Sequence, residues 1–209
     1  ISLMHKISHE ISFGPILEAA RSAKNWKNSR AYINIFEEYF TYMTQKQKNV
    51  TLQFLYELLM HREGDIRRQA ADLMGNIIVN YDEDYRKELP EGVHVDTGEI
   101  TSVQLWDRYL GMIIHPDHKV TERHRRWIGY ALKRMAESVL SRCKEKEQES
   151  YLKCFLKYYR VRELSDAEAF ILLDTMPVLP LDWLSEAEVL NLLNFAEVYL
   201  ERPILEIHV

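Results

Sequence analysis

Glycine, proline and cysteine are scarce in this chain, which has seven, six and two of them among 209 residues. A fold of many short strands needs frequent turns built on glycine and proline, so their scarcity favours long helices. The two cysteines, Cys143 and Cys154, stand eleven positions apart, which fits neither a zinc-binding spacing nor a disulfide-rich scaffold. We therefore expect two reduced thiols in a cytoplasmic protein.

Long apolar runs and an excess of positive charge are missing as well. No stretch of about 18 apolar residues is present to span a bilayer, and the start of the chain lacks a signal-peptide pattern, so we expect no membrane partner. Residues 141–209 hold 8 basic and 13 acidic side chains and thus account for the net charge of −5. Because non-specific nucleic-acid binding requires a basic excess, nucleic acid is a disfavoured partner.

Recognisable catalytic signatures are also lacking. The sequence contains no glycine-rich phosphate loop, no GxSxG elbow and no Ser/His/Asp arrangement in a known context. His5 and His9 are four positions apart, but Lys6 stands where a zinc protease needs a glutamate. We therefore expect no catalytic residue, no metal site and no cofactor.

The segment HPDHKVTERH is rich in polar side chains, namely His115, Asp117, His118, Glu122 and His124. Imidazoles and carboxylates at this density leave metal binding or acid–base chemistry as an alternative. The segment also contains a proline and joins two expected helices, a place where polar residues are usual. We interpret it as a polar connection, and any function of the turn from His115 to His118 stays open.

Helical periodicity recurs along nearly the whole chain. In the segment 30–45, for example, Ile33, Phe36, Phe40 and Met43 follow an i, i+3, i+7, i+10 spacing that places them on one helix face. The pattern predicts an all-α protein of about nine helices joined by short turns. The expected helices cover residues 15–23, 30–45, 50–61, 66–80, 102–114, 122–143, 148–160, 166–176 and 186–202.

The expected organisation is a short lead-in followed by one domain. Residues 1–13 form the lead-in, and residues 14–209 form a single helical-repeat domain interrupted by an insertion loop at 83–101, where Gly92 and Gly98 break the pattern. The helix starts are roughly 15 to 25 residues apart, as helical repeats would give. Because the chain begins at Ile1 without an initiator methionine, we interpret it as a domain excised from a larger protein.

The segment DIRRQAADLMG, from Asp65 to Gly75, resembles the second helix of a HEAT repeat, whose loose pattern is D-x-R-x-x-A-A-x-x-L-G. Thr121-Glu122-Arg123 echoes the Asp-x-Arg part, and Gly129 echoes the glycine. The register between the two segments stays open, because the glycines give an offset of 54, the caps 56 and the apolar stripes 62.

The resemblance implies an α-α superhelix of HEAT-like repeats, with the helices that begin at Asp65 and Thr121 on the same side. In that family the aspartate and the arginine are commonly structural, which implies capping and stacking roles for Asp65 and Arg67. From the residues alone, Asp65 follows Gly64 and is a suitable N-cap for the helix after it.

One basic and aromatic cluster on the helix after Thr121 is the best candidate surface for a partner. It consists of Arg123, Arg126, Tyr130, Lys133 and Arg134, with Trp127 beside them. Cationic and aromatic side chains together can bind an anionic partner, although a charged helix face is also the default for a surface helix. We refer to these five residues as the basic cluster.

The function expected from these observations is that of a non-catalytic protein-interaction or scaffold domain. Helical repeats present extended surfaces, and such surfaces commonly bind proteins or other domains of the parent chain. The alternative is a HEAT-like nucleic-acid-binding protein or an alkylpurine DNA glycosylase, with Trp106, Asp107 and Arg126 in its active groove. A third interpretation is a regulatory domain fused to an enzyme.

Overall fold

The computed structural model describes residues 3–83, 100–117, 119–160 and 163–200, and side chains from residue 12 onward. Within these ranges every regular element is helical, so the expected all-α class is confirmed. The α-helices are α1 (Leu3–Arg21), α2 (Trp26–Tyr39), α3 (Gln45–Leu58), α4 (Gly64–Val79), α5 (Ser102–Ile114), α6 (Glu122–Arg142), α7 (Gln148–Leu156), α8 (Asp166–Thr175) and α9 (Glu186–Leu200). Short 3-10 turns include η4 (Lys157–Arg160), η5 (Met176–Val178) and η6 (Leu181–Trp183).

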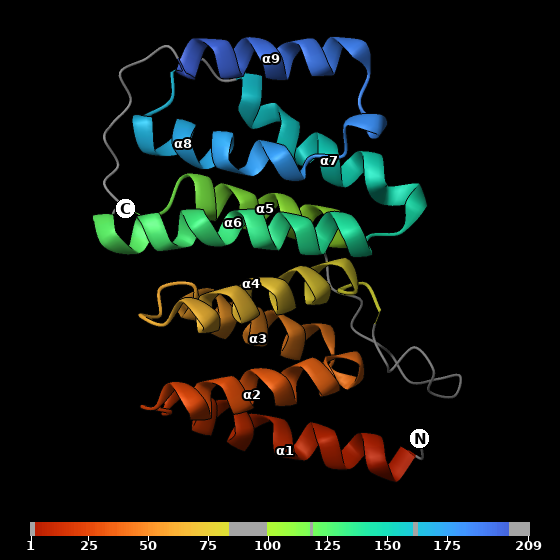
Figure 1. Cartoon of the computed structure of the whole chain (residues 1–209). Coiled ribbons are helices and arrows are strands. Elements are labelled where there is room, and N and C mark those ends of the chain that lie inside the picture. The colour runs from red at the N-terminus through yellow and green to blue at the C-terminus, as the bar shows by residue number, and fades with distance from the viewer. Residues whose placement is uncertain (1–2, 84–99, 118, 161–162, 201–209) are drawn as a thin grey trace.

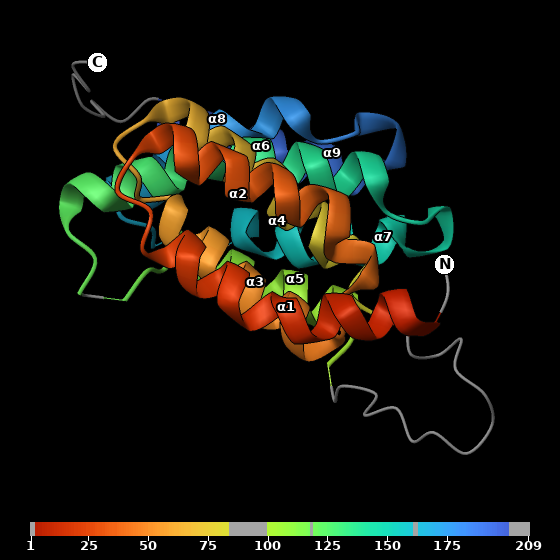
Figure 2. The same ribbon diagram turned by 90° about the horizontal axis from the view of Figure 1, so that it is seen from below.

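The helices stack in two layers from α1 at one end to α9 at the other (Figure 1). Helices α2, α4, α6 and α8 contact one another in sequence and form the front layer of Figure 1. Helix α1 contacts α3, and α5 contacts α7, in the layer behind them, and Figure 2 shows the two rows from below. As expected, the helices that follow Asp65 and Thr121 therefore lie on the same side.

Two glycines allow the front-layer helices to approach closely. A Cβ added at Gly75 of α4 would lie 2.5 Å from the Cβ of Ser138 in α6, and one at Gly129 of α6 would lie 2.6 Å from Ile171 in α8. Both distances are far below van der Waals contact, so a larger residue would require helix α4 to move away from α6 at Gly75 and the Ile171 side chain to move at Gly129. Each of the two glycines thus faces the next helix of the front layer.

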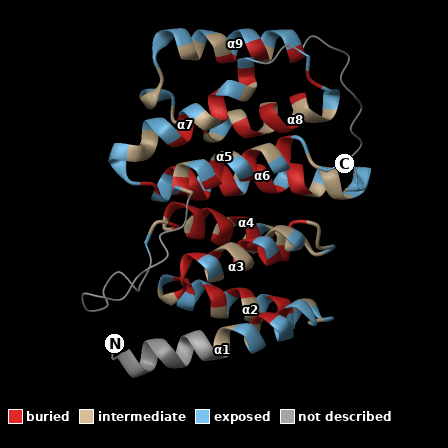
Figure 3. Ribbon diagram, turned by 180° about the vertical axis from the view of Figure 1, so that it is seen from behind, coloured by how far each residue is buried: buried red, intermediate tan, exposed pale blue. Residues whose placement is uncertain are grey.

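A continuous core runs between the layers. Leu52 and Leu55 of α3, Met74 of α4, Trp106 of α5 and Leu132 of α6 are all fully buried. Figure 3 shows the buried positions on the inward sides of the helices and the exposed ones outside. Each helix thus contributes one apolar face to a shared core, as its periodicity predicts.

Capping residues determine where several helices begin. Reciprocal capping boxes pair Thr44 with Gln47, Thr101 with Gln104 and Ser165 with Glu168. In each box the hydroxyl accepts the N–H of the third helical residue, and that residue's side chain accepts the N–H of the cap. Ser185 caps α9 in the same way, since Glu188 N–H donates to its hydroxyl oxygen at 3.3 Å.

Three expected helix starts were wrong, and one of them is that of α3, which begins at Gln45 after its Thr44 cap and not at residue 50. Helix α1 begins at Leu3, with Pro15 in its interior, instead of at residue 15. Proline removes only one backbone donor from such a helix, while Phe13 before it lies 6.3 Å from Phe36 of α2 and anchors this turn. Helix α2 begins at Trp26 instead of at residue 30, and it is capped by the Asn25 side chain.

Asp65 is also not the N-cap of α4. The cap position is Glu63, which has extended backbone angles and makes no side-chain capping bond, and Gly64 is already helical. Asp65 lies within the first turn, where its negative charge still interacts favourably with the helix dipole.

The expected insertion loop at 83–101 lies mostly outside the described residues, which end at residue 83 and resume at residue 100. Before the gap, Lys48 of α3 is fully buried, and its ammonium donates to the carbonyl oxygens of Asn80, at 2.8 Å, and Glu83. In the described residues no helix is both long and apolar enough to cross a membrane.

Candidate functional site

Asp72 is the centre of a polar network that joins α4 to α6. The two terminal nitrogens of Arg142, Nη1 and Nη2, donate to its carboxylate at 3.5 and 3.4 Å, and the Nε of Arg134 lies 3.8 Å away. The hydroxyl of Ser138 donates to the Asp72 carbonyl oxygen at 2.7 Å and accepts from Arg142 at 2.9 Å. One carboxylate thus holds two arginines that lie two helical turns apart on α6.

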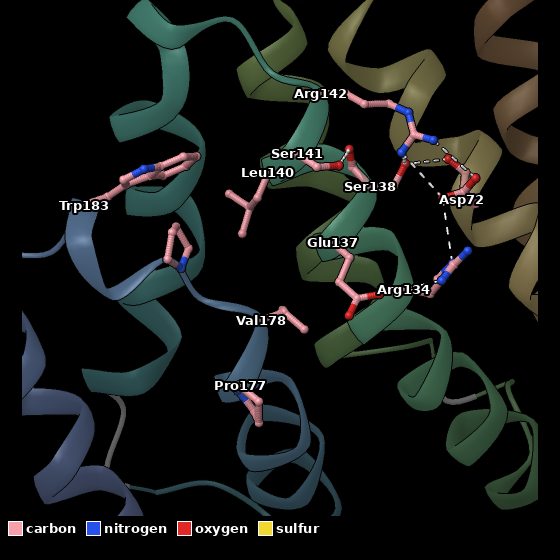
Figure 4. A pocket seen from close by; sticks show the side chains of 11 residues that line it. Asp72, Arg134, Glu137, Ser138, Leu140, Ser141, Arg142, Pro177, Val178 and Trp183 are labelled. Carbon is pink, nitrogen blue, oxygen red and sulfur yellow. Dashed lines mark hydrogen bonds and ion pairs between the residues drawn. The ribbon is translucent and has the colours of Figure 1, made fainter.

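Beside this network lies an open hollow of about 580 Å³, which we call the α6 groove (Figure 4). Its charged side carries Asp72, Arg134 and Arg142, from α4 and α6. Its apolar side is formed by side chains from α6 and the η5–η6 segment, including Leu140, Val178 and Trp183. The α6 groove therefore offers arginine donors and an aromatic ring within one depression.

A second hollow, of about 290 Å³, extends this surface toward α2. It is lined in part by Arg30, Arg68 and Gln69, and it shares Asp72 and Arg134 with the α6 groove. The two hollows consequently form one strip across the front layer, from α2 through α4 to α6. Such a strip suits an extended segment of another protein better than an isolated small molecule.

Trp127 lies next to two guanidinium groups. The guanidinium carbons of Arg67 and Arg123 are each 4.6 Å from the centre of the indole ring, a distance at which cations are attracted by its π-electrons. Arg67 also donates to the backbone oxygens of His61 and Arg62, at 2.6 and 3.0 Å, in the turn between α3 and α4. Its burial, and then the nearby arginines, lower the pKa of Arg67.

Arg67 therefore ties together the turn before its own helix and the helix of the following pair. This position is compatible with the stacking role expected for it. Asp65 instead pairs with Arg68, three residues later on the same helix.

The structure spreads the basic cluster along the exposed side of α6. Tyr130 is 45% exposed, and its ring meets that of Phe170 in α8 edge-on at 6.2 Å. Arg126 is paired with Glu122 at 3.9 Å, while Arg134 lies 3.8 Å from Asp72 and 3.9 Å from Glu137.

Arg134 is the member of the basic cluster that lines both hollows. The acidic neighbours of Arg126 and Arg134 offset much of the positive charge of the cluster. This surface therefore carries mixed charge and is not strongly basic.

The polar turn after α5 joins a second network around Glu168. His115 Nδ1 and Arg125 Nη2 both lie 3.2 Å from one Glu168 oxygen, and Arg125 also contacts Ser165. Glu168 is itself part of the capping box of α8, so this cluster fixes the start of that helix. His118 lies outside the described residues, and among those that are described no group of three His, Cys, Asp or Glu could hold a metal ion.

The residues considered for a glycosylase do not share a surface. Trp106 is fully buried, and its indole N–H donates to the Tyr151 carbonyl oxygen at 3.1 Å, so its ring is not free to stack on a base. Asp107 forms an ion pair with Lys157 on the side of α5 that faces α7. Arg126 lies on the exposed side of the front layer.

The two thiols are free, and burial raises the pKa of both Cys143 and Cys154. A thiol with a raised pKa is a poor nucleophile because the thiolate is the reactive form. Neither cysteine is therefore suited to covalent catalysis.

Sequence reasoning missed Asp72, Arg142 and Trp183. Asp72 lies 70 residues from Arg142 and 62 from Arg134, so no local spacing connects them. One signal in the sequence could have indicated the site: Arg134 and Arg142 are eight positions apart, so about two turns of α6 bring them to the same side of the helix.

Comparison with known proteins adds no relative, since no family model, curated protein or solved structure matches the chain.

Proposed function

We propose that this chain is a HEAT-like helical-repeat domain that acts as a non-catalytic protein-interaction scaffold and binds its partner along the front layer. The observation that carries the proposal is the α6 groove, where arginines held by Asp72 face the apolar side formed by Leu140 and Trp183. A partner segment with an apolar side chain flanked by carboxylates matches both sides. Its carboxylates would compete with Asp72 for the two arginines, while its apolar group would cover the indole.

The repeat architecture is part of the same proposal. It is supported by the two-layer stacking, by the equivalent packing of Gly75 and Gly129, and by the position of Arg67 between successive helix pairs. Repeat proteins present continuous surfaces because each unit contacts only its neighbours. The proposal places the domain in the cytoplasm, where the two free thiols would stay reduced.

The test is a pull-down with the purified protein from lysates with and without nuclease treatment. The variant Arg123→Glu/Arg126→Glu/Lys133→Glu reverses three cations of the basic cluster on α6, which precede in sequence the α6 residues that line the groove. We expect a protein partner that is retained after nuclease treatment and lost with this variant.

A matched control reverses three exposed cations elsewhere, on α3, α5 and the turn before α7, in the variant Lys46→Glu/Arg108→Glu/Lys146→Glu. It changes the net charge by the same amount, so it should retain the partner. Equal loss with both variants would show that total charge, and not this surface, governs binding.

Binding to nucleic acid is the competing function, and the same experiment separates it. Recovery of nucleic acid that disappears on nuclease treatment would contradict the proposal. A titration with random duplex DNA then gives the slope of log affinity against log salt, which is steep only where several phosphates are contacted. We expect no measurable binding, because Arg126 and Arg134 are paired with carboxylates.

A further inference from the structure

Helix α9 carries apolar side chains both on the side that packs against the other helices and on the side that faces solvent. Its inner side carries Leu192, Phe195 and Tyr199, which are buried, and Phe195 lies 5.0 Å from the Tyr159 ring in η4. Its outer side carries Leu190 and Leu193, which are 57% and 59% exposed. A surface helix normally places polar side chains on its outer side.

The exposed positions follow the spacing of a helix-packing seam. The residues are Glu186, Leu190, Leu193, Glu197 and Leu200, separated alternately by four and three positions, and all five are exposed. Leu200 is the most exposed of the three leucines, at 70%. This alternation places one continuous stripe along the helix and is the spacing by which two helices pack side by side. We call these five residues the α9 stripe.

Helix α9 also differs from the central helices of the stack in what covers it. Helix α4 contacts α2, α3, α5 and α6, and α6 contacts α4, α5, α7 and α8, so each is enclosed by neighbours. Helix α9 lies at the edge of the stack, where it packs on η4 (Figure 1), and exposed positions run along it in Figure 3. The outer face of an uncovered helix is normally polar, and three exposed leucines make the α9 stripe largely apolar.

The charges of α9 determine which partner fits. Between Glu186 and Leu200 there are three glutamates and no lysine, arginine or histidine. The α9 stripe itself contains two of these glutamates, beside its leucines. A second copy of the chain would bring the same carboxylates to the interface and no cation from α9 to pair with them, so self-association is disfavoured by like charge.

We propose that the α9 stripe is a second docking surface, independent of the α6 groove, and that it binds an amphipathic helix of another protein. The partner helix has aliphatic side chains at the same four-three spacing and lysines or arginines on the flanks of its apolar stripe. Its leucines pack between Leu190, Leu193 and Leu200, and its cations pair with Glu186 and Glu197. The apolar contact supplies the affinity, and the glutamates select a basic helix over an acidic one.

The test uses two synthetic 18-residue helices with leucines at identical positions of the four-three pattern. In one peptide the remaining positions are mostly lysine, and in the other they are mostly glutamate. Fluorescence anisotropy of the labelled peptides measures their affinity for the whole chain. We expect the lysine peptide to bind in the micromolar range and at least tenfold more tightly than the glutamate peptide.

Two variants assign this binding to the α9 stripe. Leu190→Ser/Leu193→Ser should weaken binding of the lysine peptide at least tenfold, and Glu186→Lys/Glu197→Lys should reverse the preference between the peptides. Met112→Ser, which alters an exposed apolar side chain on α5, serves as the control and should bind as the unaltered chain does. All substituted residues are solvent-exposed, so far-UV circular dichroism and the thermal midpoint should not change.

Three results would overturn the proposal. One is unchanged binding of the lysine peptide by Leu190→Ser/Leu193→Ser, and another is equal affinity for both peptides. The third is concentration-dependent self-association that the same variant abolishes, since the occupant would then be a second copy of this chain. Sedimentation equilibrium distinguishes this third result from binding of the peptide alone.

Discussion

Replacing Gly75 with alanine tests the close approach of α4 and α6 most sharply. The new Cβ would lie 2.5 Å from both the Cβ and the Oγ of Ser138 and 3.1 Å from the Met135 carbonyl oxygen. Carbon atoms in contact are normally about 3.5 to 4.0 Å apart, so the two helices would have to separate by roughly 1 Å. The contacts with the Ser138 Cβ and the Met135 oxygen cannot be relieved by turning a side chain, because these two atoms move only with the helix.

The expected size of the effect combines two opposing contributions. Overpacking of this kind costs about 1 to 3 kcal/mol, and we expect the upper part of that range because the neighbours are rigid. Alanine is a better helix former than glycine by about 1 kcal/mol, which offsets part of the loss. We therefore expect Gly75→Ala to lower the free energy of unfolding by about 2 kcal/mol and the thermal midpoint by about 4 to 8 °C.

Urea denaturation followed by circular dichroism measures this loss. Gly111→Ala in α5 is the matched control, because its new Cβ would meet only the Tyr158 hydroxyl at 3.5 Å, an ordinary contact. It should leave stability unchanged or raise it by up to about 1 kcal/mol. Adding Ser138→Gly to Gly75→Ala removes both 2.5 Å contacts, so the double-mutant cycle should show coupling of at least about 1 kcal/mol. The reasoning is refuted if Gly75→Ala is as stable as the unaltered chain.

Three further predictions concern other contacts. Gly129→Ala should cost less than Gly75→Ala, about 1 kcal/mol or less, because Ile171 can change its rotamer; a loss as large as that at Gly75 would contradict this. Arg67→Ala should lower the unfolding free energy by about 1 to 2 kcal/mol, because it removes two hydrogen bonds to backbone oxygens and one contact with the Trp127 indole. Arg67→Lys should restore only part of this stability, since lysine lacks the planar guanidinium. Full restoration in urea titrations would exclude a role for the guanidinium geometry. Burial lowers the pKa of His61, so the unfolded chain takes up a proton near pH 6.5 while the folded chain does not, and stability falls as the pH drops below that value. NMR titration should give His61 a midpoint below 6.5, and a midpoint above it would reverse the sign.

Much of the fold follows from local patterns in the sequence. The bounds of α5, at Ser102 and Ile114, match the expected range, and those of α6 differ from it only by one residue at the end. Both helices were predictable because Thr101 and Thr121 are strong caps and the apolar residues recur at a regular spacing. The start of α1 was missed because Gly14 and Pro15 are strong local breakers, whereas packing of Phe13 on α2 stabilises the helix through them. Tertiary contact thus outweighed local propensity at that point.

The candidate site was predictable only in part. The exposed side of α6 follows from the spacing of Arg123, Arg126 and Tyr130, which lie on one helix face. The network around Asp72 depends on how α4 lies beside α6, and that geometry is set by Gly75 against Ser138. A single sequence identifies a glycine but not the residue that it lets approach.

Photo-crosslinking from position 130 tests the central claim most directly. Tyr130 is 45% exposed on the front layer, and p-benzoylphenylalanine in its place reports which molecule lies against that surface. The control carries the same group at Met112 of α5, which is 37% exposed. We expect a protein adduct from position 130 in cell lysate that is absent from position 112 and disappears with Arg123→Glu/Arg126→Glu/Lys133→Glu. Adducts to nucleic acid, or identical adducts from both positions, would contradict a protein-binding front layer.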